Sequence, residues 1–323
     1  MRRRRLLLAA AGGTAIVATR RAAAADRLIG WVSPESAEVV VAFFAAFRAG
    51  LDANLPAGSE PVRVLERYDD GRPGTVAGHV QELQRLGVRL IVAQGGATLP
   101  VLGAGPSVPV VYGYSGDPVA AGVARSLARP GGNATGMTFM GIELMPKRVD
   151  LVRAVLPGCR RIALLSNTRH FGEEGEIAAC QLAVAPHGID ISVHRLQSAA
   201  ELRAELTAAL DGGAEAVIAL SSALIVQQAP LLAAICRERR VPLVSGWANI
   251  ARAGALMTYG PNLAGAYRRV AHYVVRILDG ADPGSLPIER PTTFELVVNR
   301  GTARALGLEL PPLLLAQADE VIE

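Results

Sequence analysis

The sequence is poor in aromatic residues, in cysteine and in long apolar runs. Aromatic residues make up 4% of the 323 residues although 50% are hydrophobic, so we expect a core of Ala, Val and Leu, as in buried parallel strands covered by helices. No internal stretch reaches the roughly 18 to 20 apolar residues of a membrane-spanning helix. Three widely spaced cysteines, Cys159, Cys180 and Cys236, form neither a disulfide framework nor a metal motif. We expect small buried hydrophobic residues here, and one bridged pair is the alternative.

The motifs of the common enzyme classes are also absent. The sequence has no Gly-x-Ser-x-Gly, His-Glu-x-x-His or Gly-x-x-x-x-Gly-Lys pattern, and no Gly-x-Gly-x-x-Gly turn follows the first expected strand. Lys147 is the only lysine, and the five histidines are scattered without metal-ligand spacing. The sequence therefore predicts no catalytic residue, no metal site and no cofactor.

The first 25 residues have a composition of their own. Four consecutive arginines at 2–5 precede a mildly apolar segment at 6–18 and an Ala-rich stretch that ends near Ala25. This order is typical of a secretory signal peptide, and the arginine run also suits a twin-arginine signal; an uncleaved anchor is the alternative. Six of the 33 basic residues and none of the 29 acidic residues lie here, so removal of the segment leaves 27 basic against 29 acidic residues. We therefore expect no nucleic acid partner.

Beyond residue 26, strand-like and helix-like patterns alternate twice along the chain. The alternation predicts two α/β lobes with parallel sheets and a cleft between them. The expected strands are 27–33, 62–68, 89–94, 108–112, 161–166, 190–196, 216–220, 242–245, 256–259 and 293–299. The expected helices are 37–51, 75–86, 119–127, 143–156, 175–187, 199–210, 227–239, 263–278 and 302–306. Residues 129–133, Arg-Pro-Gly-Gly-Asn, are expected to form a structural turn toward the second lobe.

Four segments carry a resemblance to a known family. They are GDPVAAGVARSLARPGGNATG at 116–136, YGPN at 259–262, PTTFELVVNRGTARALGLELPPLLL at 291–315 and ADEVIE at 318–323. The chain resembles the periplasmic substrate-binding proteins of ABC transporters, in the branch that includes tryptophan- and other aromatic amino acid-binding members. The resemblance covers the whole chain after the signal-like segment.

The resemblance implies an α/β fold of the type I periplasmic binding protein class. In this fold, two Rossmann-like lobes are joined by a three-segment hinge and close over a small ligand. The crossings would be 136–139, 260–262 and 291–293. The expected domains are a signal peptide at 1–25, an N-terminal lobe of 26–137 plus 263–290, and a C-terminal lobe of 138–262 plus 291–323. The resemblance also implies a periplasmic protein without catalysis that hands its ligand to an inner-membrane ABC transporter permease, and we expect a monomer.

Short polar loops at the carboxyl ends of the expected strands are the candidate ligand-binding segments, because ligands of open α/β sheets bind at this edge. Hydroxyls at helix N-termini can hold a carboxylate, Asp117 can pair with an ammonium group, and Trp247 can cover an apolar ligand body. The candidate ligand-binding residues are Ser33, Ser36, Gly96, Thr98, Ser115, Asp117, Thr138, Asn167, Ser222, Trp247 and Asn262.

These candidates also have structural alternatives. The hydroxyl residues and Asp117 can cap helices, Trp247 can belong to the core, and Asn262 can serve the hinge. Glu35 and Asp117 are the charged residues that these loops bring to the cleft, so we expect a zwitterion, such as an amino acid or a related compound, or a modest apolar molecule.

A ligand-sensing receptor of the same fold, not coupled to transport, is the alternative function. A transcription regulator would need a DNA-binding helix-turn-helix ahead of the first lobe, where only the signal-like segment stands. A Rossmann-type enzyme is disfavoured because its motifs are absent.

Overall fold

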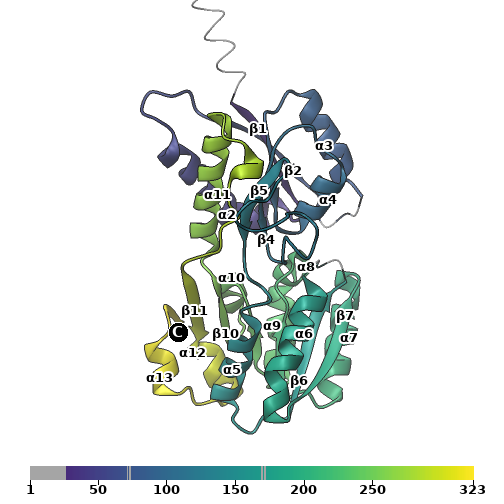
Figure 1. Cartoon of the computed structure of the whole chain (residues 1–323). Coiled ribbons are helices and arrows are strands. Elements are labelled where there is room, and N and C mark those ends of the chain that lie inside the picture. The colour runs from purple at the N-terminus through teal and green to yellow at the C-terminus, as the bar shows by residue number, and fades with distance from the viewer. Residues whose placement is uncertain (1–26, 71, 73, 169, 171) are drawn as a thin grey trace, which may run out of the picture.

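The structure is a computed structural model that describes residues 27–70, 72, 74–168, 170 and 172–323 and shows two α/β lobes stacked end to end (Figure 1). This arrangement confirms the predicted fold class. The predicted signal peptide lies outside the described residues. Within the described ranges, no helix has both the length and the apolar character needed to cross a membrane.

The upper lobe in Figure 1 is built on a five-stranded parallel sheet with the order β2-β1-β3-β4-β5. Its strands are β1 (Leu28–Ser33), β2 (Arg63–Tyr68), β3 (Ile91–Gln94), β4 (Val110–Tyr114) and β5 (Ala134–Thr138). Its helices are α2 (Ala37–Asn54), α3 (Val76–Arg85), α4 (Thr98–Gly103) and α11 (Leu263–Leu278), with the 3-10 turns η1 (Gly95–Ala97) and η4 (Pro283–Ser285).

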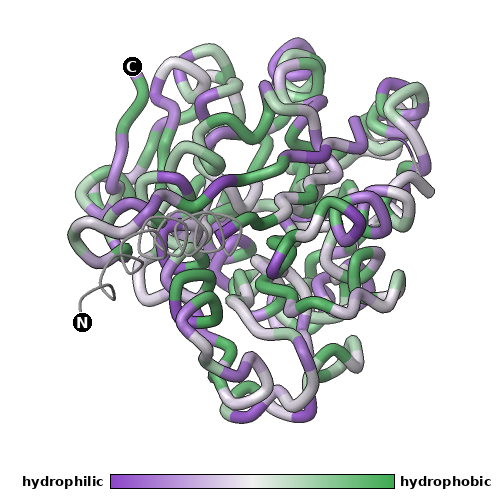
Figure 2. The backbone as a smooth tube through the Cα atoms, turned by 90° about the horizontal axis from the view of Figure 1, so that it is seen from above, coloured by the Kyte–Doolittle hydropathy of each residue, from purple (hydrophilic) through white to green (hydrophobic). Residues whose placement is uncertain are grey.

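Strand β1 is buried on both faces, which is why it reads as one apolar run. Trp31 packs in the core under α2 and α11, and its neighbour Val32 packs in the separate core under α3 and α4. Successive side chains of a strand point to opposite faces, so one short strand supports both cores. In Figure 2, hydrophobic and hydrophilic stretches alternate along the helical turns, as expected for helices with one buried face.

The lower lobe contains a seven-stranded sheet with the order β12-β11-β10-β9-β8-β6-β7. Its strands are β6 (Arg161–Asn167), β7 (Asp190–Leu196), β8 (Ala216–Ala219), β9 (Leu243–Ser245), β10 (Met257–Pro261), β11 (Phe294–Asn299) and β12 (Glu320–Ile322). Its helices are α5 (Met145–Val155), α6 (Glu173–Val184), α7 (Leu202–Asp211), α8 (Ala223–Gln227), α9 (Ala229–Glu238), α10 (Ala248–Arg252), α12 (Arg300–Leu306) and α13 (Pro312–Ala316), with the 3-10 turns η2 (Ala185–His187) and η3 (Ala199–Glu201). The strands pair in parallel except β10 with β11, which are antiparallel.

The chain passes between the lobes three times, after β5, after β10 and before β11. These segments bond to one another: Thr138 N donates to Glu289 O at 3.0 Å, and Asn262 N donates to Thr293 O at 3.2 Å. Strand β11 enters directly from a crossing, without a connecting helix, and so pairs antiparallel to β10. The predicted lobe boundaries, 26–137 plus 263–290 and 138–262 plus 291–323, stay a prediction.

The predicted helix at 119–127 is wrong, because these residues form consecutive turns. The amides of Val123 and Ala124 both donate to Pro118 O, at 2.9 and 3.0 Å. Gly122 adopts a φ of 70°, in the left-handed region that does not continue a right-handed helix. The following turn at 129–133 is structural, since Gly131 N donates to Gly284 O at 3.0 Å.

Four short helices were not predicted: α4, α8, α10 and α13. Each has five or six residues, too few to show a helical period in the sequence. The first three stand near the carboxyl ends of β3, β8 and β9, so they shape the loops in which the candidate residues lie.

All three cysteines are buried and free, which confirms the prediction of buried hydrophobic residues and makes the bridged pair wrong. Burial raises the pKa of Cys180 and of Cys236 to about 12, so both are thiols at neutral pH.

Candidate ligand-binding site

The carboxyl ends of the central strands in both lobes point toward the junction between the lobes (Figure 1). The lobes touch there: a Cβ added to Gly172 would lie 3.4 Å from the Cα of Gly116 in the upper lobe. One hydrophobic cluster also contains both Trp31 of the upper lobe and Trp247 of the lower lobe. The lobes therefore lie closed against each other, and side chains at the junction are buried.

Three upper-lobe groups at this edge are joined by hydrogen bonds. Ser33 Oγ donates to Gln94 Oε1 at 3.1 Å and accepts from Glu35 N at 3.1 Å. Thr98 Oγ1 donates to Gly95 O at 2.8 Å. These bonds fix the loops after β1 and β3, so Ser33 and Thr98 have local structural roles, and ligand contact by them stays a prediction.

The Glu35 side chain is buried beside this group, with 2% of its surface exposed. Among the residues that the structure describes, its Oε2 atom has no hydrogen-bond partner. Burial raises the pKa of Glu35 to about 7, against the opposing effect of a hydrogen bond with the Gln94 side chain. The hydroxyl of Tyr267, on the second turn of α11, is also buried without a partner. Burial, and then the nearby Glu35 charge, raise the pKa of Tyr267, so it stays neutral.

Aromatic rings surround Tyr267. Its ring centroid lies 5.7 Å from Trp31, 5.6 Å from Phe43 in a stacked arrangement, and 5.7 Å from Phe139 on the first crossing segment. In a sequence with few aromatic residues, this is a concentrated aromatic wall, and it adjoins the buried carboxyl of Glu35. These rings belong to, or pack against, the core cluster that also contains Trp247.

Asp117 and Thr138 hold the loop that follows β4. The Oδ1 atom of Asp117 accepts from Val119 N at 2.8 Å and from Ala120 N at 3.2 Å, and these bonds hold a turn, because the described residues directly after Asp117 form no helix that it could cap. Thr138 Oγ1 donates to Gly116 O at 3.2 Å. Asp117 is exposed, whereas Thr138 is buried.

The remaining upper-lobe candidates differ in exposure. Ser36 occupies the N-cap position of α2 and is half-buried, without a capping hydrogen bond from its side chain. Gly96 is exposed, and Ser115 is half-buried with its carbonyl accepting from Gly141 N at 3.1 Å. None of these facts tests ligand contact, which stays a prediction for the three residues.

In the lower lobe, the candidates lie after β6, β8, β9 and β10. Ser222 caps α8 by accepting from Ile225 N at 3.4 Å, and Asn262 caps α11 by accepting from Gly265 N at 2.5 Å. Trp247 is 6% exposed and belongs to the core cluster, and Asn167 is 7% exposed at the end of β6. Ser222, Trp247 and Asn262 therefore have structural roles, and ligand contact by these three residues and by Asn167 stays a prediction.

The lower lobe also contains a buried ionic group that was not predicted, formed by Arg148, Glu176 and His170. Arg148 Nε donates to Tyr259 O at 3.0 Å, its Nη1 lies 3.8 Å from Glu176 Oε2, and His170 Nε2 lies 2.6 Å from Glu176 Oε1. Burial lowers the pKa of His170, but the charge and hydrogen bond of Glu176 outweigh it and leave that pKa raised. Arg148 comes from α5, whereas His170 lies just before α6 and Glu176 lies in it, so the contact of the arginine with this pair could not be read from the sequence.

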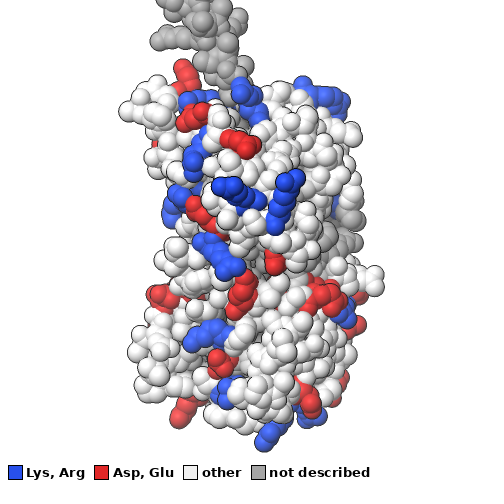
Figure 3. Space-filling model, viewed as in Figure 1, with Lys and Arg blue, Asp and Glu red and all other residues white. Residues whose placement is uncertain are grey.

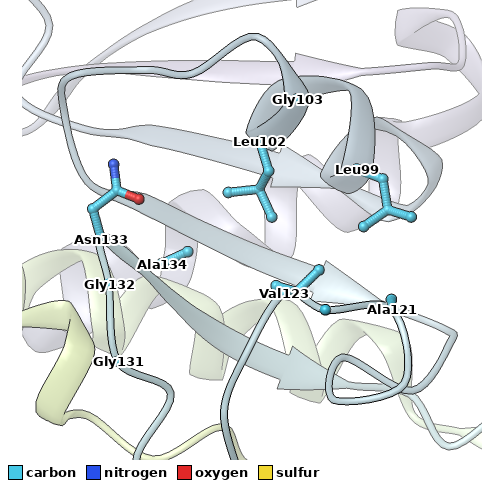
Figure 4. A pocket seen from close by; sticks show the side chains of 10 residues that line it. Leu99, Leu102, Gly103, Ala121, Val123, Gly131, Gly132, Asn133 and Ala134 are labelled. Atoms are coloured by element: carbon cyan, nitrogen blue, oxygen red, sulfur yellow. The ribbon is translucent and has the colours of Figure 1, made fainter.

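A shallow pocket of about 380 Å³ lies elsewhere in the upper lobe (Figure 4). Leu99 and Leu102 of α4 line one side, and Val123 and Ala134 line the other. Ala134 begins β5, so the pocket lies toward the amino end of that strand, away from the junction.

Basic and acidic side chains are interspersed on the face shown in Figure 3. Among the described residues, no group of three His, Cys, Asp or Glu side chains is placed to hold a metal ion.

Two lobes built on parallel-dominated sheets, with three crossings and polar loops at the junction, define a type I periplasmic binding protein-like fold. Residues 60–322 match the family described as ABC transporter substrate binding protein, and the chain belongs to this family. It is a family of substrate-binding proteins rather than of enzymes.

The chain is also similar to individual substrate-binding proteins. A tyrosine-binding protein of Clostridioides difficile (strain R20291) is 21% identical over 203 residues, which are 62% of this chain and 58% of that protein. The chain thus matches less than two thirds of that relative's length. An ABC domain from Streptococcus pneumonia, solved with L-Trp, is 20% identical with a TM-score of 0.85, covering 91% of this chain and 99% of that chain. A ligand-free, open substrate-binding protein with adhesive properties from Clostridium difficile is 19% identical with a TM-score of 0.67, covering 92% and 99%. These identities show the fold.

Proposed function

We propose that this chain is the solute-binding component of an ABC importer. It captures an amino acid or a related small molecule between its lobes and delivers it to an inner-membrane permease, without catalysing a reaction. It acts in the periplasm, as a monomer, after export directed by the signal-like segment.

The observation that carries this proposal is the set of buried polar atoms at the lobe junction that have no partner. Glu35 Oε2 and the Tyr267 hydroxyl belong to the upper lobe, and Asn249 Oδ1, in the first turn of α10, belongs to the lower lobe. Buried polar groups in proteins are nearly always hydrogen-bonded. A polar ligand held between the lobes would supply the missing partners, and the aromatic wall around Tyr267 would receive its apolar part.

The closed arrangement of the lobes also supports capture by closure. The chain superposes better on the L-Trp complex from Streptococcus pneumonia than on the ligand-free, open Clostridium difficile structure, with TM-scores of 0.85 and 0.67. Two-lobed binding proteins close around their ligands by hinge motion. The hydrogen-bonded crossings at 136–139, 260–262 and 291–293 would be that hinge.

Thermal unfolding of the purified chain against a panel of the twenty amino acids tests the ligand class. A ligand present at 100 times its dissociation constant should add about 2.7 kcal/mol to the free energy of unfolding. Small-angle scattering should show a smaller radius of gyration with that ligand. If no amino acid raises the melting temperature, the amino-acid ligand is wrong.

A matched pair of glycine variants tests closure. Gly172→Phe places a large side chain near Gly116 of the upper lobe, and also beside Glu176 and His170 of its own lobe, and should keep the radius of gyration from shrinking with ligand. Gly158→Phe is the control, because no heavy atom lies within 4 Å of a Cβ at that position. Equal compaction of both variants would contradict closure at this contact.

Uptake measurements in a deletion strain distinguish a transport protein from a ligand-sensing receptor. Cells without this gene should lose high-affinity uptake of the ligand found in the panel, and the gene in trans should restore it. Unchanged uptake in the deletion strain would favour the ligand-sensing alternative.

A further inference from the structure

The carboxyl of Glu35 is buried among neutral groups. In the described part of the chain, no Lys, Arg or His nitrogen lies within ion-pair distance of it. Its surroundings are Ser33 of β1, Gln94 of β3 and Tyr267 of α11, none of which carries a charge at neutral pH. Of its two oxygens, Oε2 makes no hydrogen bond.

A carboxylate in this position is costly unless a cation arrives. Burying an ionised group without a partner is strongly unfavourable, and proteins respond by pairing the charge or by keeping the group protonated. Buried carboxylates are normally paired with a donor, as Glu173 and Glu176 of α6 are in the lower lobe. Glu35 instead stands unpaired at the lobe junction, between the end of β1 and the start of α2.

We propose that Glu35 binds a cationic nitrogen of the ligand, an ammonium group above all, and thereby selects amines and amino acids over neutral or acidic molecules of the same shape. The second orphan atom, the Tyr267 hydroxyl, lies on the same wall and adds a neutral hydrogen-bond partner. Phe43, stacked on Tyr267, places apolar surface beside the charge, so the favoured ligand carries its ammonium next to an aromatic or apolar group. This inference rests on the proposed function.

The pairing makes affinity depend on pH. The ammonium group requires an ionised Glu35, whose pKa in the free protein is raised to about 7 by burial. Gln94 and Ser33 do not titrate, and the pKa of Tyr267 is raised, so Glu35 is the group that changes charge here between pH 5 and 8. Binding below pH 7 therefore releases a proton. As the pH is lowered below 7, the affinity for the ligand falls by up to about tenfold per pH unit.

The test compares matched ligands on matched variants by titration calorimetry. The probes are L-tryptophan and indole-3-propionate, and L-tyrosine and 3-(4-hydroxyphenyl)propionate, each pair differing by the amino group. The wild-type chain should bind the amino acid about 10- to 100-fold more tightly than its deamino partner, since a hydrogen bond to a charged group is being compared with none. Glu35→Gln should remove most of that difference and the loss of affinity below pH 7. Asp52→Asn, which alters an exposed carboxylate on α2, the helix that follows Glu35, should change neither.

The possible results distinguish a failure of the proposed role of Glu35 from a failure of the proposed function. Equal affinity of wild type for an amino acid and its deamino partner, or unchanged amino-acid affinity in Glu35→Gln, would overturn the role of Glu35 and leave the proposed function standing. Failure of every amino acid and simple amine to bind would overturn both. If Glu35→Gln does not fold, the wild-type comparison of paired ligands and the pH dependence still decide.

Discussion

The close packing of α2 on α11 makes a strong prediction about two glycines. Gly50 lies in α2 where that helix meets α11, and a Cβ there would lie 2.7 Å from both Cα and O of Arg268 and 2.9 Å from Cβ of Ala271. Two of these three atoms are backbone, so the helices would have to separate. Gly78 lies in α3, exposed, with no heavy atom within 4 Å of an added Cβ.

The variants Gly50→Ala and Gly78→Ala share a gain in helix propensity and differ in packing. Each replaces a helical glycine by alanine, which favours the helix by about 0.5 to 1 kcal/mol. Only Gly50→Ala adds overpacking, which costs about 1 to 3 kcal/mol. We therefore expect Gly78→Ala to be as stable as wild type or more stable, and Gly50→Ala to be about 1 to 3 kcal/mol less stable than Gly78→Ala.

Urea unfolding at equilibrium, followed by circular dichroism, measures the difference. Both glycines lie in the upper lobe, so both variants report on the same unfolding transition. The urea midpoints should separate while the slopes stay equal. A Gly50→Ala midpoint equal to or above that of Gly78→Ala would refute the close approach of α2 and α11.

Two further predictions concern buried titratable groups. Because burial raises the pKa of Glu35 from 4.5 to about 7, its contribution to the stability of the ligand-free chain is complete below pH 4.5 and falls by about 3 kcal/mol as the pH rises through 7. Glu35→Gln should flatten this loss in urea unfolding at pH 4.5, 6 and 8, and an equally steep loss in the variant would contradict the burial. The thiols of Cys159, Cys180 and Cys236 should react with a thiol reagent only after unfolding, and a reductant should leave the melting temperature unchanged; rapid labelling of the folded chain would show that they are not buried.

Where apolar residues recur regularly over a whole element, the predicted element and the observed one agree. The helix predicted at 263–278 is α11, because its apolar residues recur on one face for more than four turns. The strand predicted at 190–196 is β7 with the same bounds. The helix predicted at 119–127 failed because Gly122 takes a left-handed φ and the segment bonds to Pro118 and to the next turn instead.

For the site, sequence reasoning located the loops but not the partners within them. Helix capping by Ser222 and Asn262 and turn formation by Asp117 were foreseeable, since each acts on an amide two or three residues ahead. The isolation of Glu35 and the buried contact of Arg148 with Glu176 were not foreseeable, because they depend on distant elements.

By itself, the sequence determined the α/β class, the two lobes and the family, because alternating apolar runs and long distinctive segments are local properties of the chain. The tertiary structure decided which polar groups become buried and which of them lack a partner. Burial arises only when segments distant in the sequence pack together. Glu35 is an ordinary loop residue in the sequence, and the packing of β3 and α11 around its carboxyl makes it the charge that the proposed ligand would neutralise.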